Sequence, residues 1–321
     1  MKISTKALKI AALGVSAATM MVATQEASAH ASVLNTVNSG KAIGSTSFSR
    51  IGVNHACTGT TPVTPVVAQS AVIPTINPVI STATVTNNVA GAYTIQTGAV
   101  VSDYLFSNYG SVAGVSPVVN PTPLTTLAGL FNLVQSKDVF SSSIEQRNAA
   151  NAVIGWVSTK GGLQINEHGE VPFRFTNVFF GRNSCVHDVV VQLAVADICK
   201  ITSKPPFTTL AKSQGVELWI DNTLASLPTE FPAVAIENSA GTTNLTINRD
   251  PIQDPYPASC ANAPIASAAT NLAATTQANA VTGYTAGATP LTSVKIQPSA
   301  DDLKQLQFPG WGTPVSGNTF Q

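Results

Sequence analysis

The chain has 321 residues, of which only 10% are charged and 44% are hydrophobic, and its 16 basic and 16 acidic residues cancel. Soluble domains usually carry about 25% charged residues, so this composition favours a secreted or cell-surface β-rich protein. Without an excess of basic residues there is no electrostatic basis for binding nucleic acid.

The first 29 residues have the three parts of a secretory signal peptide. Three lysines lie within the first nine residues, residues 10–23 form an apolar run, and Ala27-Ser28-Ala29 supplies the small residues that a signal peptidase reads. The apolar run is shorter than the roughly 20 residues that span a bilayer. Cleavage after Ala29 would leave His30 as the first residue, whereas a second A-x-A site, ending at Ala31, would remove it. We therefore expect export to the periplasm or the cell surface, without a transmembrane span.

Residues 30–260 are predicted to form one mainly β domain. β-Branched and aromatic runs separated by turn residues are typical of strands in an antiparallel β-sandwich. The clearest runs are "TSFSRIGV" (46–53), "EVPFRFTNVFF" (170–180), "HDVVVQLAVADIC" (187–199), "VELWIDN" (216–222) and "TTNLTINR" (242–249).

Two other regions are expected to depart from this β pattern. In "LTTLAGLFNLVQ" (124–135) and "SIEQRNAANAVIGWV" (143–157) the apolar residues recur at helical spacing, which predicts a short helical insertion over about 102–160. Residues 261–321 are rich in Ala and Thr and poor in aromatic residues. That composition predicts a poorly ordered tail.

The predicted mature chain carries four cysteines, Cys57, Cys185, Cys199 and Cys260. In an exported protein this even number indicates two disulfides, with three pairings open. Cys185 and Cys199 flank one strand-like run, so a local pair between them is one possibility, and it would join Cys57 to Cys260. A cysteine metal site is the alternative, although no C-x-x-C spacing is present.

Three histidines are candidate metal ligands, because imidazole is a common ligand of copper and zinc. As the first residue, His30 would offer a metal both its α-amine and a ring nitrogen. His55 lies two residues before Cys57 in a turn-like stretch, and His187 lies two residues after Cys185 in a strand. Each also has an ordinary interpretation, as a frayed terminus, a turn residue or a buried neighbour of a disulfide. We expect copper to be held by His30 and His55 first, and by His187 next.

Segments 49–63 ("SRIGVNHACTGTTPV"), 171–199 ("VPFRFTNVFFGRNSCVHDVVVQLAVADIC") and 216–251 ("VELWIDNT…LTINRDP") resemble the surface copper-binding proteins of methane-oxidising bacteria, the MopE and CorA group. The resemblance implies a copper site displayed at the cell surface. The first segment is also similar to the exported YcnI-like domain. There His30 would match the N-terminal histidine of a copper brace, and residues 55–59 would match H-G-C-x-G, with Ala56 in place of glycine.

The function predicted from these features is copper acquisition or buffering at the cell surface, with Cu(I) or Cu(II) as the bound ion and a surface or periplasmic redox partner. The alternative is a structural surface-layer or adhesion protein without metal chemistry. No G-x-S-x-G, H-E-x-x-H or P-loop motif is present, so we predict that the protein is not an enzyme. A histidine-brace oxidase acting on polysaccharide would share His30 but needs a second brace histidine.

Overall fold

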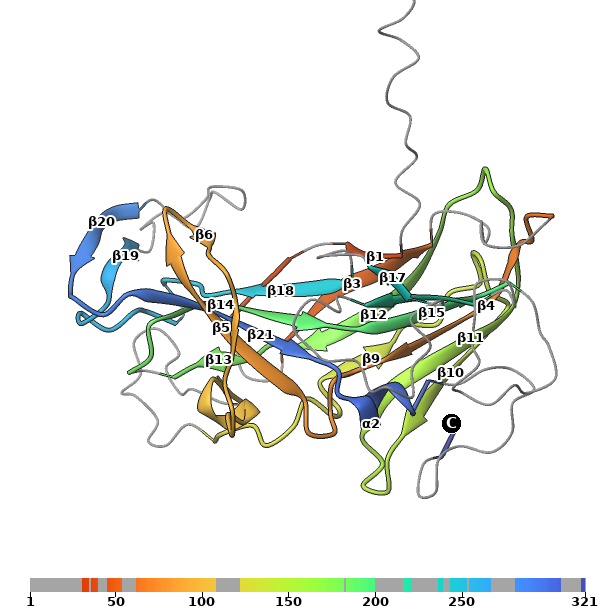
Figure 1. The fold of residues 1–321 in the computed structure, drawn as a ribbon, viewed down its shortest axis with the longest axis horizontal. Helices are drawn as coiled ribbons and strands as arrows, with labels where there is room; N and C mark the ends of the chain where they lie inside the picture. The colour runs from red at the N-terminus through yellow and green to blue at the C-terminus, as the bar shows by residue number, and fades with distance from the viewer. Residues whose placement is uncertain are drawn as a thin grey trace, which may run out of the picture.

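The structure of the chain is a computed structural model that describes residues 31–34, 36–39, 45–53, 62–107, 122–181, 183–199, 216–220, 236–238, 243–252, 254–266, 281–306 and 319–320. In these ranges the protein is mainly β, as predicted, and its sheets are antiparallel or mixed. Two short helical segments accompany the strands, the 3-10 helix η1 (Val101–Asp103) and the helix α2 (Ala300–Leu303) (Figure 1). None of the described helices has the length and apolar character needed to cross a membrane.

Seven strands form the sheet that we call the β15 sheet. Neighbouring strands in it run antiparallel, except for the parallel pair β16 and β17. Across the sheet the order is β17 (Ile236–Asn238), β16 (Val216–Ile220), β15 (Ala194–Ile198), β4 (Val66–Val72), β11 (Val153–Leu163), β10 (Ser142–Arg147) and β22 (Thr319–Phe320).

A second sheet, which we call the β14 sheet, is mixed, because β14 pairs in parallel with β21 and β18 pairs in parallel with β2. β7 (Thr94–Ile95) pairs with β5 beside this path. The order of its other strands is β2 (Val37–Asn38), β18 (Asn244–Asn248), β14 (Val186–Gln192), β21 (Leu291–Gln297), β5 (Val79–Thr86) and β6 (Val89–Ala90).

Three smaller sheets complete the architecture, and all of their pairs are antiparallel. The largest is a four-stranded sheet in the order β1 (Ser32–Leu34), β3 (Thr46–Val53), β12 (Gly169–Thr176) and β9 (Phe131–Leu133). The two-stranded sheets are β8 (Leu105–Phe106) with β13 (Phe179–Phe180), and β19 (Ala261–Ala266) with β20 (Val281–Ala286).

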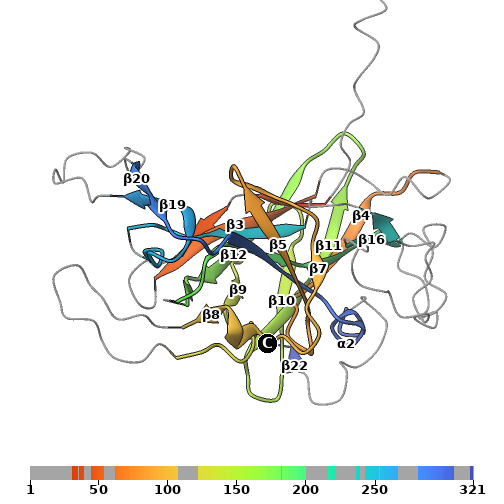
Figure 2. The same ribbon diagram turned by 60° about the vertical axis from the view of Figure 1, so that its left-hand side comes forward.

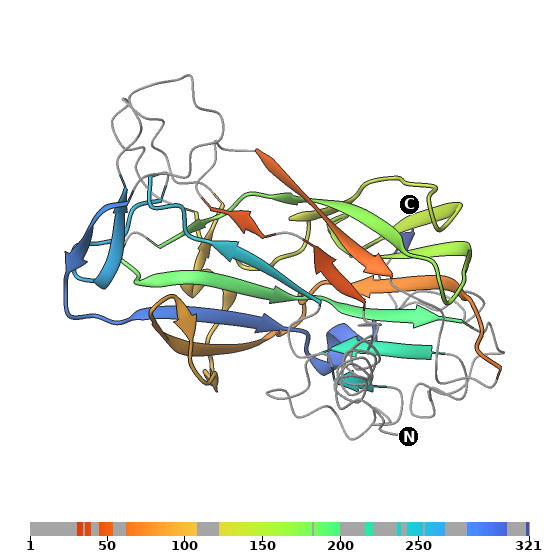
Figure 3. The same cartoon turned by 90° about the horizontal axis from the view of Figure 1, so that it is seen from above.

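The β14 and β15 sheets are joined end to end by one continuous run of chain. Only Leu193 separates β14 from β15, and Figure 3 shows the two green strands following one another along the long axis. Residues 189–199 are all buried. A strand that is covered on both faces usually has a continuously apolar sequence rather than alternating apolar and polar residues. This explains why "VVVQLAVADI" has no polar face.

A single large hydrophobic core lies where the sheets meet. The Trp156 ring on β11 lies 5.5 Å from the Phe173 ring on β12, which packs the β15 sheet against the four-stranded sheet. Val191 of β14 and Ile296 of β21 belong to the same buried cluster. Each fully buried aromatic or aliphatic side chain stabilises the fold by about 1.5–3 kcal/mol, so this shared cluster holds the layers together.

The helical insertion expected over 102–160 is wrong at the two segments that suggested it, 124–135 and 143–157, which form strands and turns. Its second half forms the hairpin of β10 and β11, and β11 lies inside the β15 sheet between β10 and β4. The hairpin turns where the Asn148 side chain accepts hydrogen bonds from the backbone N–H groups of Ala150 and Ala152 and where Asn151 has a φ of 61°. Within 124–135, Gly129 has a φ of 80°, which interrupts a helical path through that segment. Apolar spacing alone did not distinguish these turns from helices.

The expected end of the β domain at Cys260 is also wrong, because β21 lies within the β14 sheet between β14 and β5. Residues 281–306 of the expected tail therefore belong to the fold. Three residues of β21, Leu291, Val294 and Ile296, are buried and supply its apolar contacts. The Ala- and Thr-rich composition of residues 261–321 as a whole did not reveal this strand.

α2 follows β21 and lies over the outer face of the β15 sheet (Figure 2). Its Leu303 belongs to a second buried cluster with residues of β4, β15 and β16. The buried Asp302 carboxylate accepts hydrogen bonds from the backbone N–H groups of Thr75 and Ile76, both at 2.8 Å, and of Ser299 at 3.0 Å. Since residues 73–78 connect β4 to β5, this carboxylate ties the passage between the two large sheets to α2.

We expect Asp302→Ala to lower the free energy of unfolding by about 2–4 kcal/mol, because it leaves three partly buried N–H groups without their acceptor. Asp301→Ala is the matched control, since Asp301 is exposed and pairs only with Lys304 among the ion pairs found. It should change stability by no more than about 0.5 kcal/mol. Urea unfolding measures both, and equal losses would contradict the role given to Asp302.

Candidate functional site

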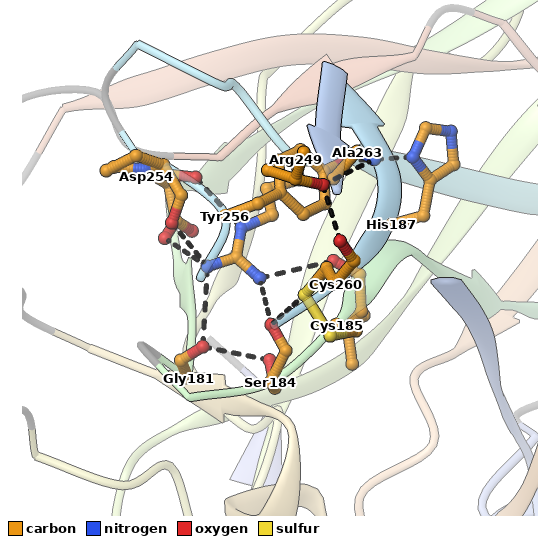
Figure 4. The surroundings of a disulfide bond; sticks show 12 residues. Gly181, Ser184, Cys185, His187, Arg249, Asp254, Tyr256, Cys260 and Ala263 are labelled. Atoms are coloured by element: carbon orange, nitrogen blue, oxygen red, sulfur yellow. Dashed lines mark hydrogen bonds and ion pairs between the residues drawn. A yellow bond between two sulfur atoms is a disulfide. The ribbon is translucent and has the colours of Figure 1, made fainter. Parts of the chain in front are cut away.

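Of the three predicted copper ligands, the structure describes only His187, while His30 and His55 lie outside the described residues. His187 stands near the start of β14 and is half-buried. Its Nδ1 atom lies 2.8 Å from the Tyr256 hydroxyl, and the two rings stack with centroids 6.3 Å apart. One ring nitrogen of His187 is therefore already engaged inside the protein (Figure 4).

Burial sets the protonation of this pair. It lowers the pKa of His187, although the neighbouring Asp188 carboxylate acts in the opposite direction. Burial raises the pKa of Tyr256, against the effect of the Arg249 charge. At neutral pH the imidazole is neutral and the phenol keeps its proton, so the contact is a hydrogen bond between neutral groups. Among the described residues, no group of three His, Cys, Asp or Glu side chains is arranged to hold a metal ion.

A disulfide lies beside this pair and joins Cys185 to Cys260. The local pair between Cys185 and Cys199 is thus wrong. β14 and β15 hold those two residues at opposite ends of an extended run, up to about 46 Å apart at about 3.3 Å per residue, whereas bonded cysteines need Cα atoms within about 7 Å. Cys199 also forms a disulfide, and Cys57 lies outside the described residues.

The disulfide closes a long loop, since its cysteines are 75 residues apart. A loop of that length is worth about 4 kcal/mol in the chain-entropy description of cross-links. It joins the start of β14 to the start of the β19–β20 hairpin, and the buried residues Val85, Ala263 and Leu291 pack around it. The hairpin is therefore fixed to the end of the β14 sheet.

Arg249 connects the same two segments through hydrogen bonds, and its side chain is fully buried. On one side its guanidinium donates to the carbonyls of Gly181, Ser184 and Val186, at 3.4, 2.7 and 3.3 Å. On the other side it donates to the carbonyls of Asp254 and Pro255, at 2.8 and 2.9 Å. Figure 4 shows the guanidinium between these segments, next to the disulfide.

The charge of Arg249 is balanced by Asp254, whose Oδ1 atom lies 3.3 Å from the guanidinium. The other carboxylate oxygen accepts hydrogen bonds from the Phe180 backbone N–H and the Ser39 hydroxyl. Burial raises the pKa of Asp254, and the Arg249 charge opposes that rise. The guanidinium also lies 4.7 Å from the centre of the Tyr256 ring, a cation–π contact. We call Arg249, Asp254 and Tyr256 with the Cys185–Cys260 disulfide the arginine cage.

A cleft of about 540 Å³ opens next to the arginine cage, between the β5–β6 turn and the β19–β20 hairpin. Val85 and Leu291 belong both to its lining and to the buried cluster around the disulfide. Figure 1 shows the hairpin beyond the end of the β14 sheet, next to the end of β5. The lining consists of Thr84, Val85, Thr86, Asn87, Asn88, Ala261, Asn262, Tyr284, Pro290 and Leu291.

Backbone contacts also fix the far wall of the cleft. The Ala261 N–H donates to the Thr289 carbonyl at 2.7 Å, and the Thr289 N–H donates to the Ser259 carbonyl at 2.9 Å. Gly287 approaches the Ser259 backbone so closely that a Cβ atom there would lie 2.1 Å from it. The loop from β20 to β21 is thus held against the residues that flank Cys260.

Comparisons of the chain with protein-family models, with curated proteins and with solved structures give no match. The arginine cage and the cleft are therefore interpreted from their geometry alone.

Sequence reasoning missed Arg249 and the cleft asparagines, although each has a signal. Leu245 and Ile247 alternate on β18 and belong to the core, and Arg249, the first residue after that strand, continues the same face. Asn87 and Asn88 stand between two β-branched runs as a two-residue loop, a pattern typical of a tight hairpin turn.

We expect Arg249→Lys to destabilise the fold by about 3–5 kcal/mol, because an ammonium group leaves several buried carbonyls without a donor. Arg174→Lys serves as the control, since Arg174 is exposed on β12 and should tolerate the change within about 0.5 kcal/mol. Guanidinium unfolding under oxidising conditions measures the difference. Similar losses for both variants would show that the arginine cage does not depend on the guanidinium.

The pH dependence of stability should report the burial of His187. Its pKa is lower in the folded state than in the unfolded state, where it is about 6.5, so the unfolded chain binds more protons. Stability from this group is then present above pH 6.5 and is lost as the pH falls from that value through the lower folded-state pKa. We expect His187→Gln to remove this part of the decline between pH 7 and pH 5. An unchanged difference between wild type and variant across that range would contradict it.

Proposed function

We propose that the chain is an exported adhesion protein of the cell surface, and that the cleft beside the arginine cage is its recognition site. The observation that carries this proposal is the way the cleft is built. One wall is a strand end of the β14 sheet, the other is the β19–β20 hairpin, and a disulfide and a buried arginine lock the segments from which the walls extend. A rigid cleft loses little conformational entropy when a ligand binds.

The chemistry of the cleft favours binding over catalysis. Its described lining offers amides, hydroxyls and one phenol, and none of these residues carries a carboxylate, an imidazole, an amine or a thiol. Export forms part of the proposal. It is supported by the signal-like segment 1–29 and is compatible with the disulfide, since such bonds persist in oxidising compartments.

Copper binding stays a prediction, together with its redox partner. Its first two ligands, His30 and His55, lie outside the described residues, and His187 engages one ring nitrogen with Tyr256. No feature of the described residues favours copper binding over adhesion, so adhesion is the function that we propose.

Adhesion can be tested with microspheres that carry the full oxidised chain, perfused over immobilised cellulose, chitin, mannan, gelatin and phospholipid bilayers. We expect retention on at least one surface. Thr86→Trp should abolish retention, because Thr86 is exposed in the cleft and an indole there would fill it. Thr94→Trp is the matched control, since Thr94 is exposed on β7 and does not belong to the cleft lining.

Retention on none of the surfaces would overturn the proposal. So would retention that Thr86→Trp and Thr94→Trp reduce equally, because the cleft would then have no part in it. Thermal unfolding of both variants checks that the substitutions leave the fold intact.

A further inference from the structure

We infer that the cleft binds an uncharged oligosaccharide, with Tyr284 as the surface on which a sugar ring stacks and three asparagine amides as the groups that read its hydroxyls. This inference rests on the proposed function, because it names the ligand of the same cleft.

The cleft lacks charge, which narrows the ligand class. None of the ten described residues that line it is Asp, Glu, Lys, Arg or His. Phosphorylated, sulfated or carboxylated ligands are normally held by basic side chains or helix N-termini. A ligand that fits this lining is therefore neutral and polar. The volume of about 540 Å³ falls in the range of ligand sites, roughly 300–1,000 Å³.

Three asparagines border the cleft with unusual backbones. Asn87, Asn88 and Asn262 have φ values of 51°, 61° and 52°. Glycine adopts positive φ without the steric cost of a side chain, so the backbone alone does not require an amide at any of these positions. None of the three amides forms a hydrogen bond with the described part of the protein. Each therefore keeps its donors and its acceptor for a ligand, as adjacent sugar hydroxyls require.

The backbone at these asparagines also fixes where the amides stand. Asn87 and Asn88 form the two-residue turn between β5 and β6, closed by the pair of Thr86 with Val89. Positive φ at both central residues is the type I′ geometry, which suits the twist of a hairpin. The hydroxyls of Thr84 and Thr86 lie exposed on the strand that leads into this turn. A rigid row of neutral polar groups thus forms one wall.

Tyr284 supplies the apolar contact on the opposite wall. It is 64% exposed, although it is a large aromatic residue in a strand. An aromatic face attracts the positively polarised C–H groups of a ring stacked on it, and one face of a pyranose presents such C–H groups. An exposed tyrosine next to unpaired amides therefore matches both surfaces of a sugar.

A peptide fits the same cleft less well. Peptide recognition relies on apolar anchors that enter accessible pockets. The two large aliphatic residues of the lining, Val85 and Leu291, are only 8% and 5% exposed. The floor is thus closed by packing around the disulfide, and the accessible surface consists of polar groups, the Tyr284 ring and the small apolar residues Ala261 and Pro290, which form no deep apolar pocket for a peptide anchor.

The test uses the full oxidised chain and six-unit oligosaccharides of glucose, mannose and N-acetylglucosamine, with a heparin hexasaccharide and a polyglutamate peptide as charged probes. Titration calorimetry should show binding of at least one neutral oligosaccharide and of neither charged probe. Tyr284→Ala and the double variant Asn87→Gly/Asn88→Gly should each weaken binding about tenfold or more. The glycine variant keeps the positive φ of the turn, and Phe48→Ala is the control for an exposed aromatic elsewhere, 62% exposed on β3.

Binding of only the charged probes, binding of no oligosaccharide, or equal affinity in all variants would overturn the inference. The microsphere assay distinguishes failure of the oligosaccharide assignment from failure of the proposed function. If Thr86→Trp abolishes adhesion but no neutral oligosaccharide binds or competes, adhesion stands and the sugar assignment fails. If Thr86→Trp leaves adhesion unchanged, both fail.

Discussion

The hydrogen bonding of Arg249 is the constraint on which the candidate site depends. A buried guanidinium is costly unless its charge is paired and its N–H groups find acceptors. Here the acceptors are one carboxylate and five backbone carbonyls, and the carbonyls belong to residues 181–186 and 254–255. Both segments must adopt their observed conformations together, because the loss of either one would leave N–H groups of the buried guanidinium without acceptors. The disulfide then joins segments that Arg249 already holds in place.

Much of the fold class could be predicted from the sequence, and the reason is local. β-Branched and aromatic runs such as 46–53 and 186–198 are enriched in strands, and the structure has strands there. The helical interpretation of 143–157 failed because the spacing of Ile144, Val153 and Trp156 suits a hairpin as well as a helix. The turn geometry at Asn148 and Asn151 determines that the segment forms a hairpin. The periodicity of apolar residues does not reveal such a turn.

The candidate site was much less predictable, because its contacts join distant parts of the chain. Arg249 meets Ser184 across 65 residues, and Cys185 meets Cys260 across 75. Four cysteines allow three pairings, and spacing along the chain left all of them open. Choosing correctly required knowing that β14 and β15 are collinear, which holds Cys185 and Cys199 far apart. That is a property of sheet topology rather than of either strand.

The arginine cage affects the cleft by holding its walls in place rather than by contacting a ligand. Arg249 lies in the interior, whereas Asn87, Asn88 and Tyr284 lie on walls that project beyond the sheet. A wall that projects as a two-stranded hairpin is only marginally stable by itself, and its motion would add an entropic cost to every binding event. By fixing the base of β19 next to Cys260, Arg249 and the disulfide remove that cost in advance. The buried Arg249 thus positions the walls of the cleft without lining it.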